Sequence, residues 1–159
     1  MTAEKNLTKP IRLKAMNLMA RREHSKMELE THLTKKFPDD PGTIVEVLNQ
    51  LESDGLLSDE RFAECFITGS ISKGRGPQRI KRELMERGVN EIMAREILAR
   101  MEIDWFAVAK QVFGRKFSKA IDGNLSATES LRLKAQQARF MQYRGFDYEL
   151  IKYCVDGND

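Results

Sequence analysis

Histidine and cysteine are scarce in this chain, which has two of each among its 159 residues. His24 is expected at the start of a helix and His32 on a helix flank, where such residues are more often surface or packing groups than ligands. The sequence contains no HExxH motif, no Cys/His zinc spacing and no nucleophile elbow. It therefore predicts no catalytic residues, no metal site and no cofactor, and we do not expect an enzyme.

Long apolar runs are also missing from the sequence. No stretch approaches the roughly 18 apolar residues of a membrane-spanning helix, and the start MTAEKNLTKP lacks the apolar core of a signal peptide. Cys65 and Cys154 fall on apolar faces of expected helices, which predicts buried thiols rather than a disulfide. Together these features predict a protein of a reducing cytoplasm without membrane association.

The alternation of apolar and polar residues that is typical of β-strands is absent, and apolar residues recur instead at helical spacing. Capping boxes, which mark helix starts, occur at Ser25 with Glu28 and at Ser126 with Glu129, and Thr43 with Glu46 is expected to start the third helix. Further candidate caps are Ser58, Asn90 and Asp104, and the last helix is expected to start from Asp147. The pattern predicts an all-α fold with helices over residues 10–22, 25–37, 43–55, 58–72, 77–87, 90–101, 104–117, 126–144 and 147–155. The apolar stripe expected to be buried on the helix after Ser126 comprises Leu131, Ala135, Ala138 and Met141.

The expected helices repeat in groups of three. ELMERGV at residues 83–89 resembles FMQYRGF at residues 140–146. We therefore expect three tandem three-helix repeats, at residues 10–57, 58–102 and 103–155. A unit of roughly fifty residues is marginally stable alone, so the repeats should stack into an elongated, curved rod.

A basic, glycine-rich turn joins two helices in the middle of the chain. Gly74 and Gly76 break the first helix, and Pro77 fits the first position of the second, where its missing N–H is tolerated. Free backbone N–H groups at that helix start, with Arg75 and Arg79 beside them, predict a site for phosphate or carboxylate. The alternative is that the glycines only form a tight connection and that the arginines are solvated.

Two consecutive motifs cover this region: D-x-R-F-x-x-x-F-I at Asp59–Ile67 and K-G-x-G-P-x-R-I-x-x-E-L at Lys73–Leu84. Together they resemble the central repeat of the RecX family, bacterial regulators of the RecA recombinase. Residues 24–33 and 134–146 resemble the first and third repeats of that family, although Phe37 stands where the repeat pattern has glycine. The resemblance implies three tandem three-helix repeats, a bacterial cytoplasmic location and the RecA filament as partner.

Basic residues are unevenly distributed, although the formal net charge is only +3. Residues 73–144 hold twice as many basic as acidic residues, whereas the rest of the chain is net acidic. We expect Arg87 to pair with Glu83 and Arg95 with Glu91, each four positions earlier on a helix, so these two arginines are not counted among the charges offered to a partner. The remaining charge predicts a surface for a polyanion or an acidic protein. The candidate RecA- or DNA-binding residues are Lys73, Arg75, Arg79, Lys81, Arg82, Arg115, Lys116, Lys119, Lys134, Arg139 and Arg144.

Two functions from different classes fit these patterns. The resemblance implies a negative regulator of recombination and DNA repair that binds the RecA nucleoprotein filament and inhibits its extension, ATPase and strand exchange. Such a protein is expected to be monomeric and to bind single-stranded DNA weakly, with duplex DNA as a further candidate ligand. The alternative is a helix-turn-helix protein that reads duplex DNA with the helix from Pro77 to Arg87, although beyond Gln78 that helix has no Asn or Gln for base readout. A weaker third interpretation is a general helical adaptor.

Overall fold

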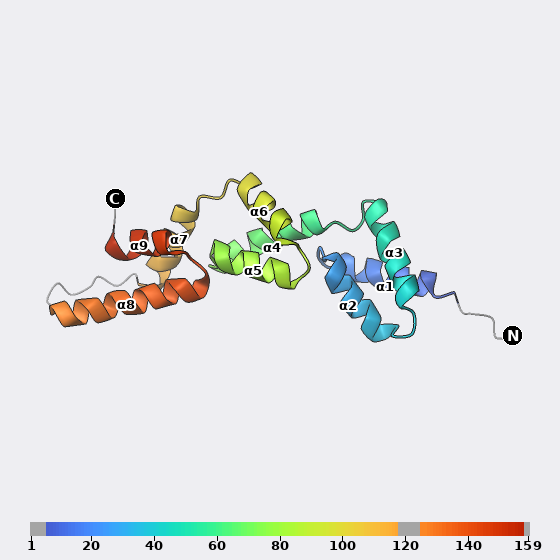
Figure 1. The fold of residues 1–159 in the computed structure, drawn as a ribbon, viewed down its shortest axis with the longest axis horizontal. Coiled ribbons are helices and arrows are strands. Elements are labelled where there is room, and N and C mark those ends of the chain that lie inside the picture. Colours follow the sequence, from blue (N-terminus) through green and yellow to red (C-terminus); the bar gives the residue numbers. More distant parts are fainter. Residues whose placement is uncertain (1–5, 118–124, 158–159) are drawn as a thin grey trace. The chain divides into compact units, whose positions relative to one another are not determined.

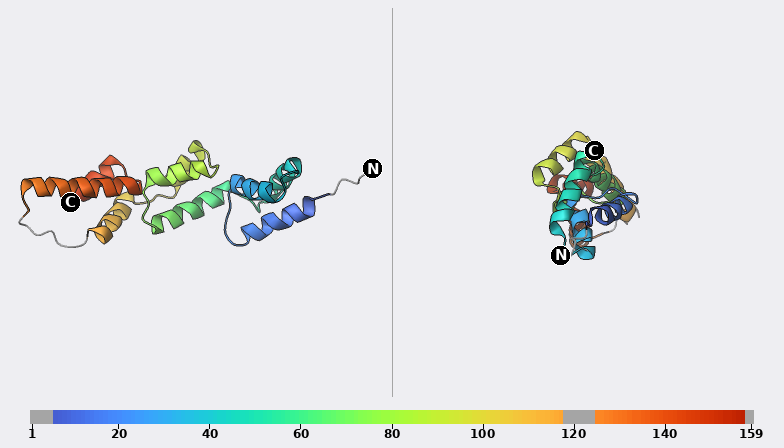
Figure 2. Two further views of the ribbon diagram at one scale, coloured as in Figure 1. Left: turned by 90° about the horizontal axis from the view of Figure 1, so that it is seen from below. Right: turned by 90° about the vertical axis from the view of Figure 1, so that its right-hand side faces the viewer.

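The computed structural model describes residues 6–117 and 125–157. Within these residues the regular structure is α-helical and contains no β-strand, which confirms the all-α prediction. Figure 1 labels the helices, and Figure 2 shows them from two further directions. They are α1 (Thr8–Met19), α2 (Lys26–Lys36), α3 (Pro41–Ser53), α4 (Asp59–Ser72), α5 (Pro77–Glu86), α6 (Glu91–Arg100), α7 (Trp105–Lys116), α8 (Ala127–Arg144) and α9 (Tyr148–Asp156). The boundaries of the three repeats stay a prediction.

Side chains that the sequence predicts as caps accept backbone N–H groups at the N-termini of several helices. The Ser25 hydroxyl accepts the Glu28 N–H at 3.1 Å, while the Glu28 carboxylate accepts the Ser25 N–H at 3.1 Å. Ser126 and Glu129 repeat this exchange at α8. Each exchange satisfies two N–H groups that a helix start would otherwise leave unpaired. Single side-chain caps are also confirmed at Ser58, Asn90 and Asp104, and the Asp147 side chain caps α9 in the same way.

The connection between α2 and α3 is shorter than the sequence predicts. Helix α2 ends at Lys36, just before Phe37-Pro38, because the residue before a proline disfavours helical angles. The sequence predicts a loop through Gly42, but α3 already begins at Pro41. Proline suits the first helical position, where no N–H is needed, so this boundary prediction is wrong by two residues. The expected start at Thr43 with Glu46 is wrong too, because Thr43 lies inside α3 and the N-cap is Asp40.

Contacts between Cα atoms divide the described chain into two compact units. Unit 1 comprises residues 6–66 and 84–97, and unit 2 comprises residues 67–83, 98–117 and 125–157. In unit 1, α1, α2 and α3 pack on one another. Burial of one large aliphatic side chain contributes about 1.5–3 kcal/mol, so such a core is the main source of stability. The buried residues of this core are Ile11, Ala15, Leu29, Leu33, Ile44, Val47, Leu48, Leu51 and Leu57.

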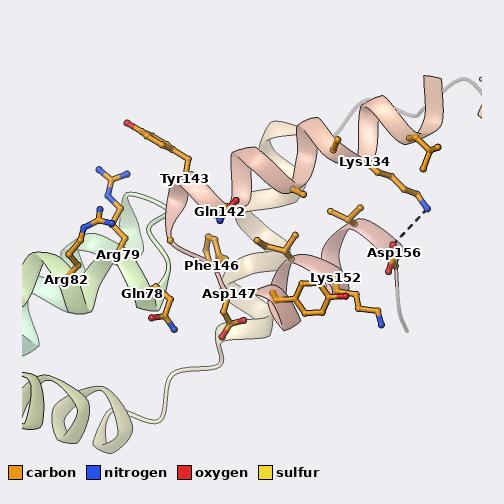
Figure 3. Close-up of a pocket in the computed structure, with 17 residues that line it drawn as sticks. Gln78, Arg79, Arg82, Lys134, Gln142, Tyr143, Phe146, Asp147, Lys152 and Asp156 are labelled. Atoms are coloured by element: carbon orange, nitrogen blue, oxygen red, sulfur yellow. Dashed lines mark ion pairs between the residues drawn. The ribbon is translucent and has the colours of Figure 1, made fainter. Parts of the chain in front are cut away.

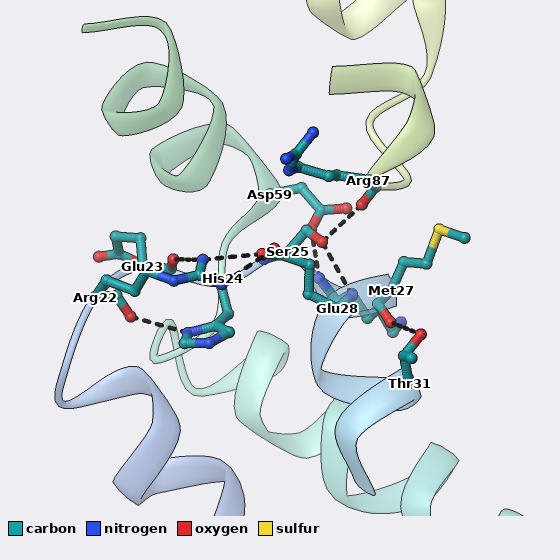
Figure 4. A network of polar contacts seen from close by, with 10 residues as sticks. Arg22, Glu23, His24, Ser25, Met27, Glu28, Thr31, Asp59 and Arg87 are labelled. Carbon is teal, nitrogen blue, oxygen red and sulfur yellow. Dashed lines mark hydrogen bonds and ion pairs between the residues drawn. The ribbon is translucent and has the colours of Figure 1, made fainter. Parts of the chain in front are cut away.

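A polar network at the start of α2 ties distant parts of unit 1 together (Figure 4). The Ser25 hydroxyl donates to the Arg87 carbonyl oxygen at 2.6 Å. The Lys26 N–H donates to the Asp59 carboxylate at 2.8 Å. Asp59 of the central motif therefore satisfies a free N–H of another helix, which is a structural role.

Arg61, the other charged residue that the motif D-x-R-F specifies, also has a structural role in unit 1. Its guanidinium donates to the carbonyl oxygens of Gly55 at 2.8 Å and Leu56 at 3.0 Å. Its Nε lies 3.2 Å from a carboxylate oxygen of Glu23. Arg61 thus stabilises the turn that precedes α4 by satisfying its carbonyl groups.

The core of unit 2 lies between α7, α8 and α9. Its buried residues are Ala109, Met141, Phe146 and Leu150, and the half-buried Trp105, Val108, Val112, Phe113, Phe140, Ile151 and Cys154 pack against them. The Phe117 ring centre lies 5.0 Å from that of Phe113 and 5.5 Å from that of Phe140. This aromatic cluster holds the end of α7 against α8.

Two predictions of burial are wrong. Cys65 is exposed, because it lies outside the stripe of α4 that buries Phe62 and Ala63. Leu131 and Ala135 are exposed as well, and Leu131 retains 69% of its accessible surface. The buried residues of α8 all lie in its C-terminal half, so the core covers only that half of the helix.

Candidate functional site

The glycine-rich turn before α5 lies against the end of α8. The Gly76 N–H donates to the Arg144 carbonyl oxygen at 2.7 Å, and the Gln78 N–H donates to the Gly145 carbonyl oxygen at 3.0 Å. A helix start has unpaired N–H groups and a helix end has unpaired carbonyl groups, so α5 and α8 satisfy each other. The prediction of free N–H groups for an anion is therefore wrong at both positions.

Glycine is required on both sides of this contact because the two backbones touch. A Cβ added at Gly76 would lie 2.5 Å from the carbonyl carbon and oxygen of Gly145. Gly145 itself ends α8 in the left-handed region with φ 102°, and a Cβ there would collide with the Cβ of Arg79. These contacts form what we term the α5–α8 joint. The structure thus supports the alternative reading of the glycines as a tight connection.

Arg75 and Arg79, the pair predicted to bind an anion, both face Glu83. The Arg79 Nε donates to a Glu83 carboxylate oxygen at 2.8 Å, and an Arg75 Nη lies 3.7 Å from the other oxygen. The Arg79 guanidinium also lies 5.6 Å from the centre of the Tyr143 ring. Spacing along the sequence assigns Glu83 to Arg87 and misses this arrangement. Arg75 and Arg79 therefore have internal anionic and aromatic partners, which reduce the charge that they offer to a partner molecule.

A second group of predicted residues is brought together from three separate segments. Lys73 comes from the turn before α5, Arg115 and Lys116 from the last turn of α7, and Arg144 from the last turn of α8. They line a hollow of about 240 Å³ together with Ser72, Gly74, Val112 and Phe140. We term this feature the basic hollow.

The charges of the basic hollow are not balanced within it. None of the described residues that line the hollow is acidic. The Arg144 guanidinium donates to the Lys73 carbonyl oxygen at 2.9 Å and lies 5.3 Å from the centre of the Phe140 ring. The Lys116 ammonium lies 5.6 Å from the same ring centre. The four cationic side chains of the lining can receive phosphate groups or carboxylates, and the Phe140 ring, with two of these cations close to it, can receive a base.

The other candidate residues lie outside the basic hollow. Lys134 lies 4.0 Å from an Asp156 carboxylate, and both side chains are about half exposed. Lys134 and Arg82 line a larger groove beside α8 and α9, which no sequence pattern indicated. Arg139 is exposed, Lys81 is half-buried, and Lys119 lies outside the residues that the structure describes.

Three side chains away from the hollow have shifted pKa values. Burial lowers the pKa of His24 below its ordinary value of 6.5. Burial acts to raise the pKa of Glu28, but hydrogen bonds from Arg22 and from the Ser25 N–H outweigh it and hold the pKa below 4.5. Burial raises the pKa of the Cys154 thiol.

Across residues 6–117 and 125–157, no cluster of three or more His, Cys, Asp or Glu side chains is placed to hold a metal ion. In the same residues, no helix has both the length and the apolar character needed to cross a membrane.

Comparison with known proteins gives concordant matches. The family description "RecX, second three-helix domain" matches residues 58–98. A protein of Halorhodospira halophila named Regulatory protein RecX is 38% identical over 149 residues, which cover 94% of this chain and 88% of the relative. The Pseudomonas entomophila protein of the same name is 37% identical over 150 residues, which cover 94% and 92%.

Solved structures agree on the fold. The crystal structure of RecX from Lactobacillus salivarius superposes with a TM-score of 0.73 over 94% of this chain and 95% of that chain, at 18% identity. A second crystal structure, of a regulatory protein RecX, also gives a TM-score of 0.73, over 95% of this chain and 72% of that chain, at 14% identity.

Proposed function

The chain belongs to the RecX family of regulatory proteins, and from this premise we propose that it binds the RecA nucleoprotein filament and inhibits it. The proposed inhibition covers filament extension, ATP hydrolysis and strand exchange. It works by binding rather than by catalysis, in the bacterial cytoplasm.

The basic hollow is the observation that supports this proposal. Lys73, Arg115, Lys116 and Arg144 present four positive charges with no acidic residue in the lining. A nucleoprotein filament offers two matching anionic surfaces, the phosphates of its DNA and acidic side chains of its protomers. Charge of one sign around a hollow raises the rate of encounter with such a partner.

Binding of this kind can inhibit a filament without any chemistry in the regulator. A protein that binds one conformation of a filament shifts the population toward that conformation. If the bound state adds protomers or completes ATP hydrolysis more slowly than the free state, extension and strand exchange both decline. Several weak contacts along a repetitive partner add through their high effective concentration, so no single contact must be strong.

The structure argues against the duplex-reading alternative for α5. A recognition helix contacts bases with residues near its N-terminus. At this end of α5, the N–H groups of Gly76 and Gln78 bind α8 and the Arg79 side chain binds Glu83. A helix start that is covered in this way is poorly placed to enter a major groove.

The proposal is tested by reversing charge at the basic hollow. We expect Arg115→Glu with Lys116→Glu to raise the concentration needed for half-inhibition of RecA strand exchange by at least about tenfold, because favourable contacts become repulsive. This pair is preferable to Arg75 and Arg79, where added carboxylates would face Glu83 and disturb folding.

Lys35→Glu with Lys36→Glu is the matched control. This pair also occupies the last turn of a helix, α2, is exposed, and makes the same change in net charge. It should inhibit within about twofold of the original protein, since exposed charges outside a contact surface contribute little. Equal loss in both double variants, or no loss at the basic hollow, would contradict the proposal.

A further inference from the structure

A groove along α8 and α9 in unit 2 is separate from the basic hollow (Figure 3). It has a volume of about 730 Å³, and α8, α9 and the start of α5 supply its lining. Between Leu131 and Tyr143, α8 runs along the groove for roughly 18 Å, which is about three helical turns. We term this feature the α8–α9 groove.

The floor of the α8–α9 groove is aliphatic and lacks a covering element among the described residues. Leu131 is 69% exposed, Ala135 is exposed, and Ile151 and Val155 are half-buried. Leu131, Ala135 and Ala138 recur at helical spacing, so they form one continuous stripe on α8. The two alanines leave room for another backbone to approach closely. Such a stripe normally faces another helix.

Cationic side chains lie at both ends of this apolar floor. Arg79 and Arg82 lie near Tyr143 at one end, and Lys134 and Lys152 lie at the other (Figure 3). The acidic residues of the lining are Asp147 and Asp156, which lies 4.0 Å from Lys134. The net charge of the lining is positive, and it stays positive when Glu83, the ion-pair partner of Arg79, is included. A complementary partner therefore has an apolar stripe with acidic residues on its flanks.

We propose that the α8–α9 groove binds an acidic amphipathic helix, about three turns long, presented by a protein partner. Helices of this kind bind hydrophobic grooves through side chains at i, i+3 or i+4 and i+7. Tyr143 and Tyr148, which are 78% and 75% exposed, also line the groove and offer rigid amphipathic surface. The inference rests on the proposed function, which makes the RecA protomer the partner that carries this helix.

A nucleic acid fits this groove less well. Bases bind by stacking on aromatic rings and phosphates bind to clustered cations. The groove does have exposed tyrosines and cations in its lining, but the aliphatic floor of Leu131, Ile151 and Val155 offers neither a ring nor a charge. The basic hollow, by contrast, places two cations within 6 Å of one ring. The two surfaces of unit 2 therefore fit different chemical classes of ligand.

Photo-crosslinking from within the groove tests the inference. Leu131→p-benzoylphenylalanine in the full chain is incubated with RecA filaments on single-stranded DNA and irradiated. Mass spectrometry should then identify crosslinks to one acidic helical segment of RecA. The control, Ile92→p-benzoylphenylalanine, has a matched exposure of 71% on α6 and should give no crosslink to that segment.

Affinity measurements complete the test. Leu131→Glu should weaken binding to RecA filaments by at least about tenfold, because a carboxylate would enter an apolar contact between acidic flanks. Ile92→Glu should stay within about twofold. Lys152→Glu should also weaken binding, most strongly at low salt, where charge attraction is least screened.

The possible failures are distinguishable. If the unaltered protein does not bind filaments, the proposed function itself is wrong. If the unaltered protein binds and Leu131→Glu binds equally well, only the α8–α9 groove is wrong. Crosslinks from position 131 to DNA, to a second copy of this chain or within the chain would also overturn the inference and identify the actual occupant.

Discussion

Individual residues of the central motif act mainly in packing. Asp59 accepts the first N–H of α2, Arg61 stabilises a turn, and Gly76 allows two backbones to touch. By contrast, Arg115 and Lys116 of the basic hollow lie outside the motif. A motif of this kind identifies the fold, because its residues make packing contacts. It says less about the partner surface, and this is why the anion site predicted beside Gly76 was misplaced.

Substitution of Gly76 tests the packing role at the scale of one residue. We expect Gly76→Ala to lower the free energy of unfolding by about 1–3 kcal/mol, because its Cβ would meet backbone that cannot rotate away. Urea denaturation followed by circular dichroism measures this change.

Gly114→Ala provides the matched control, because a Cβ at this position in α7 has no atom within 4 Å. It should stabilise the protein by about 0.5–1 kcal/mol through better helix propensity. Loss of stability of similar size in both variants would show that the α5–α8 joint is not the cause.

At the scale of the element, the sequence predicts where helices start better than what their ends contact. Capping boxes such as Ser25 with Glu28 depend on groups three residues apart, so local chemistry is sufficient. The acceptors of the Gly76 and Gln78 N–H groups lie far along the chain and carry no signal in a single sequence. The apolar stripe of α8 that includes Leu131 and Ala135 shows the same limit. Helical periodicity identifies the apolar face of a helix, but it does not show whether another part of the chain covers that face.

The start of α2 should make the protein sensitive to acid. The pKa of buried His24 is lowered below 6.5 in the folded state, so the unfolded chain binds a proton more readily. The stability that neutral His24 contributes is complete above about pH 6.5 and declines as the pH falls toward the folded pKa. Glu28 adds a second decline below pH 4.5, because its folded pKa is also lowered.

Urea denaturation at pH 7.5, 6.0 and 5.0 measures the first decline. It should be no steeper than about 1.4 kcal/mol per pH unit, the limit for one proton. His24→Asn should flatten the decline over this range. His32→Asn should reduce it only slightly, because the charge of His32, whose ring centre lies 6.1 Å from that of His24, is the weakest of the influences on the His24 pKa. An undiminished decline in His24→Asn would assign the acid sensitivity to other groups.

For the whole molecule, the distribution of charge is more informative than its total. The formal net charge of +3 is small, yet the four cations of the basic hollow face no acidic residue in its lining. The sequence predicts the excess of basic residues between positions 73 and 144. It does not predict which of them are balanced locally, because Glu83 receives Arg75 and Arg79 only in the folded chain.

The dependence of DNA binding on salt tests this distribution. Each phosphate contact to single-stranded DNA contributes about 0.7 to the slope of log affinity against log salt concentration. Arg115→Glu with Lys116→Glu should therefore flatten the slope for an oligo-dT ligand by about 1.4, if both side chains contact phosphate. Fluorescence anisotropy between 50 and 300 mM salt measures the slope, and the Lys35→Glu, Lys36→Glu protein should retain it. Parallel slopes for all three proteins would exclude phosphate contacts at the basic hollow.

The α5–α8 joint has a practical consequence for anyone who shortens this protein. A fragment of residues 58–102 would retain every letter of the central motif, yet the carbonyl groups that complete its glycine turn belong to Arg144 and Gly145. In such a fragment the N–H groups of Gly76 and Gln78 would lose their carbonyl acceptors, and the surface of Gly76 that packs on Gly145 would be uncovered. Truncated versions that are intended to stay folded should therefore extend through the end of α8.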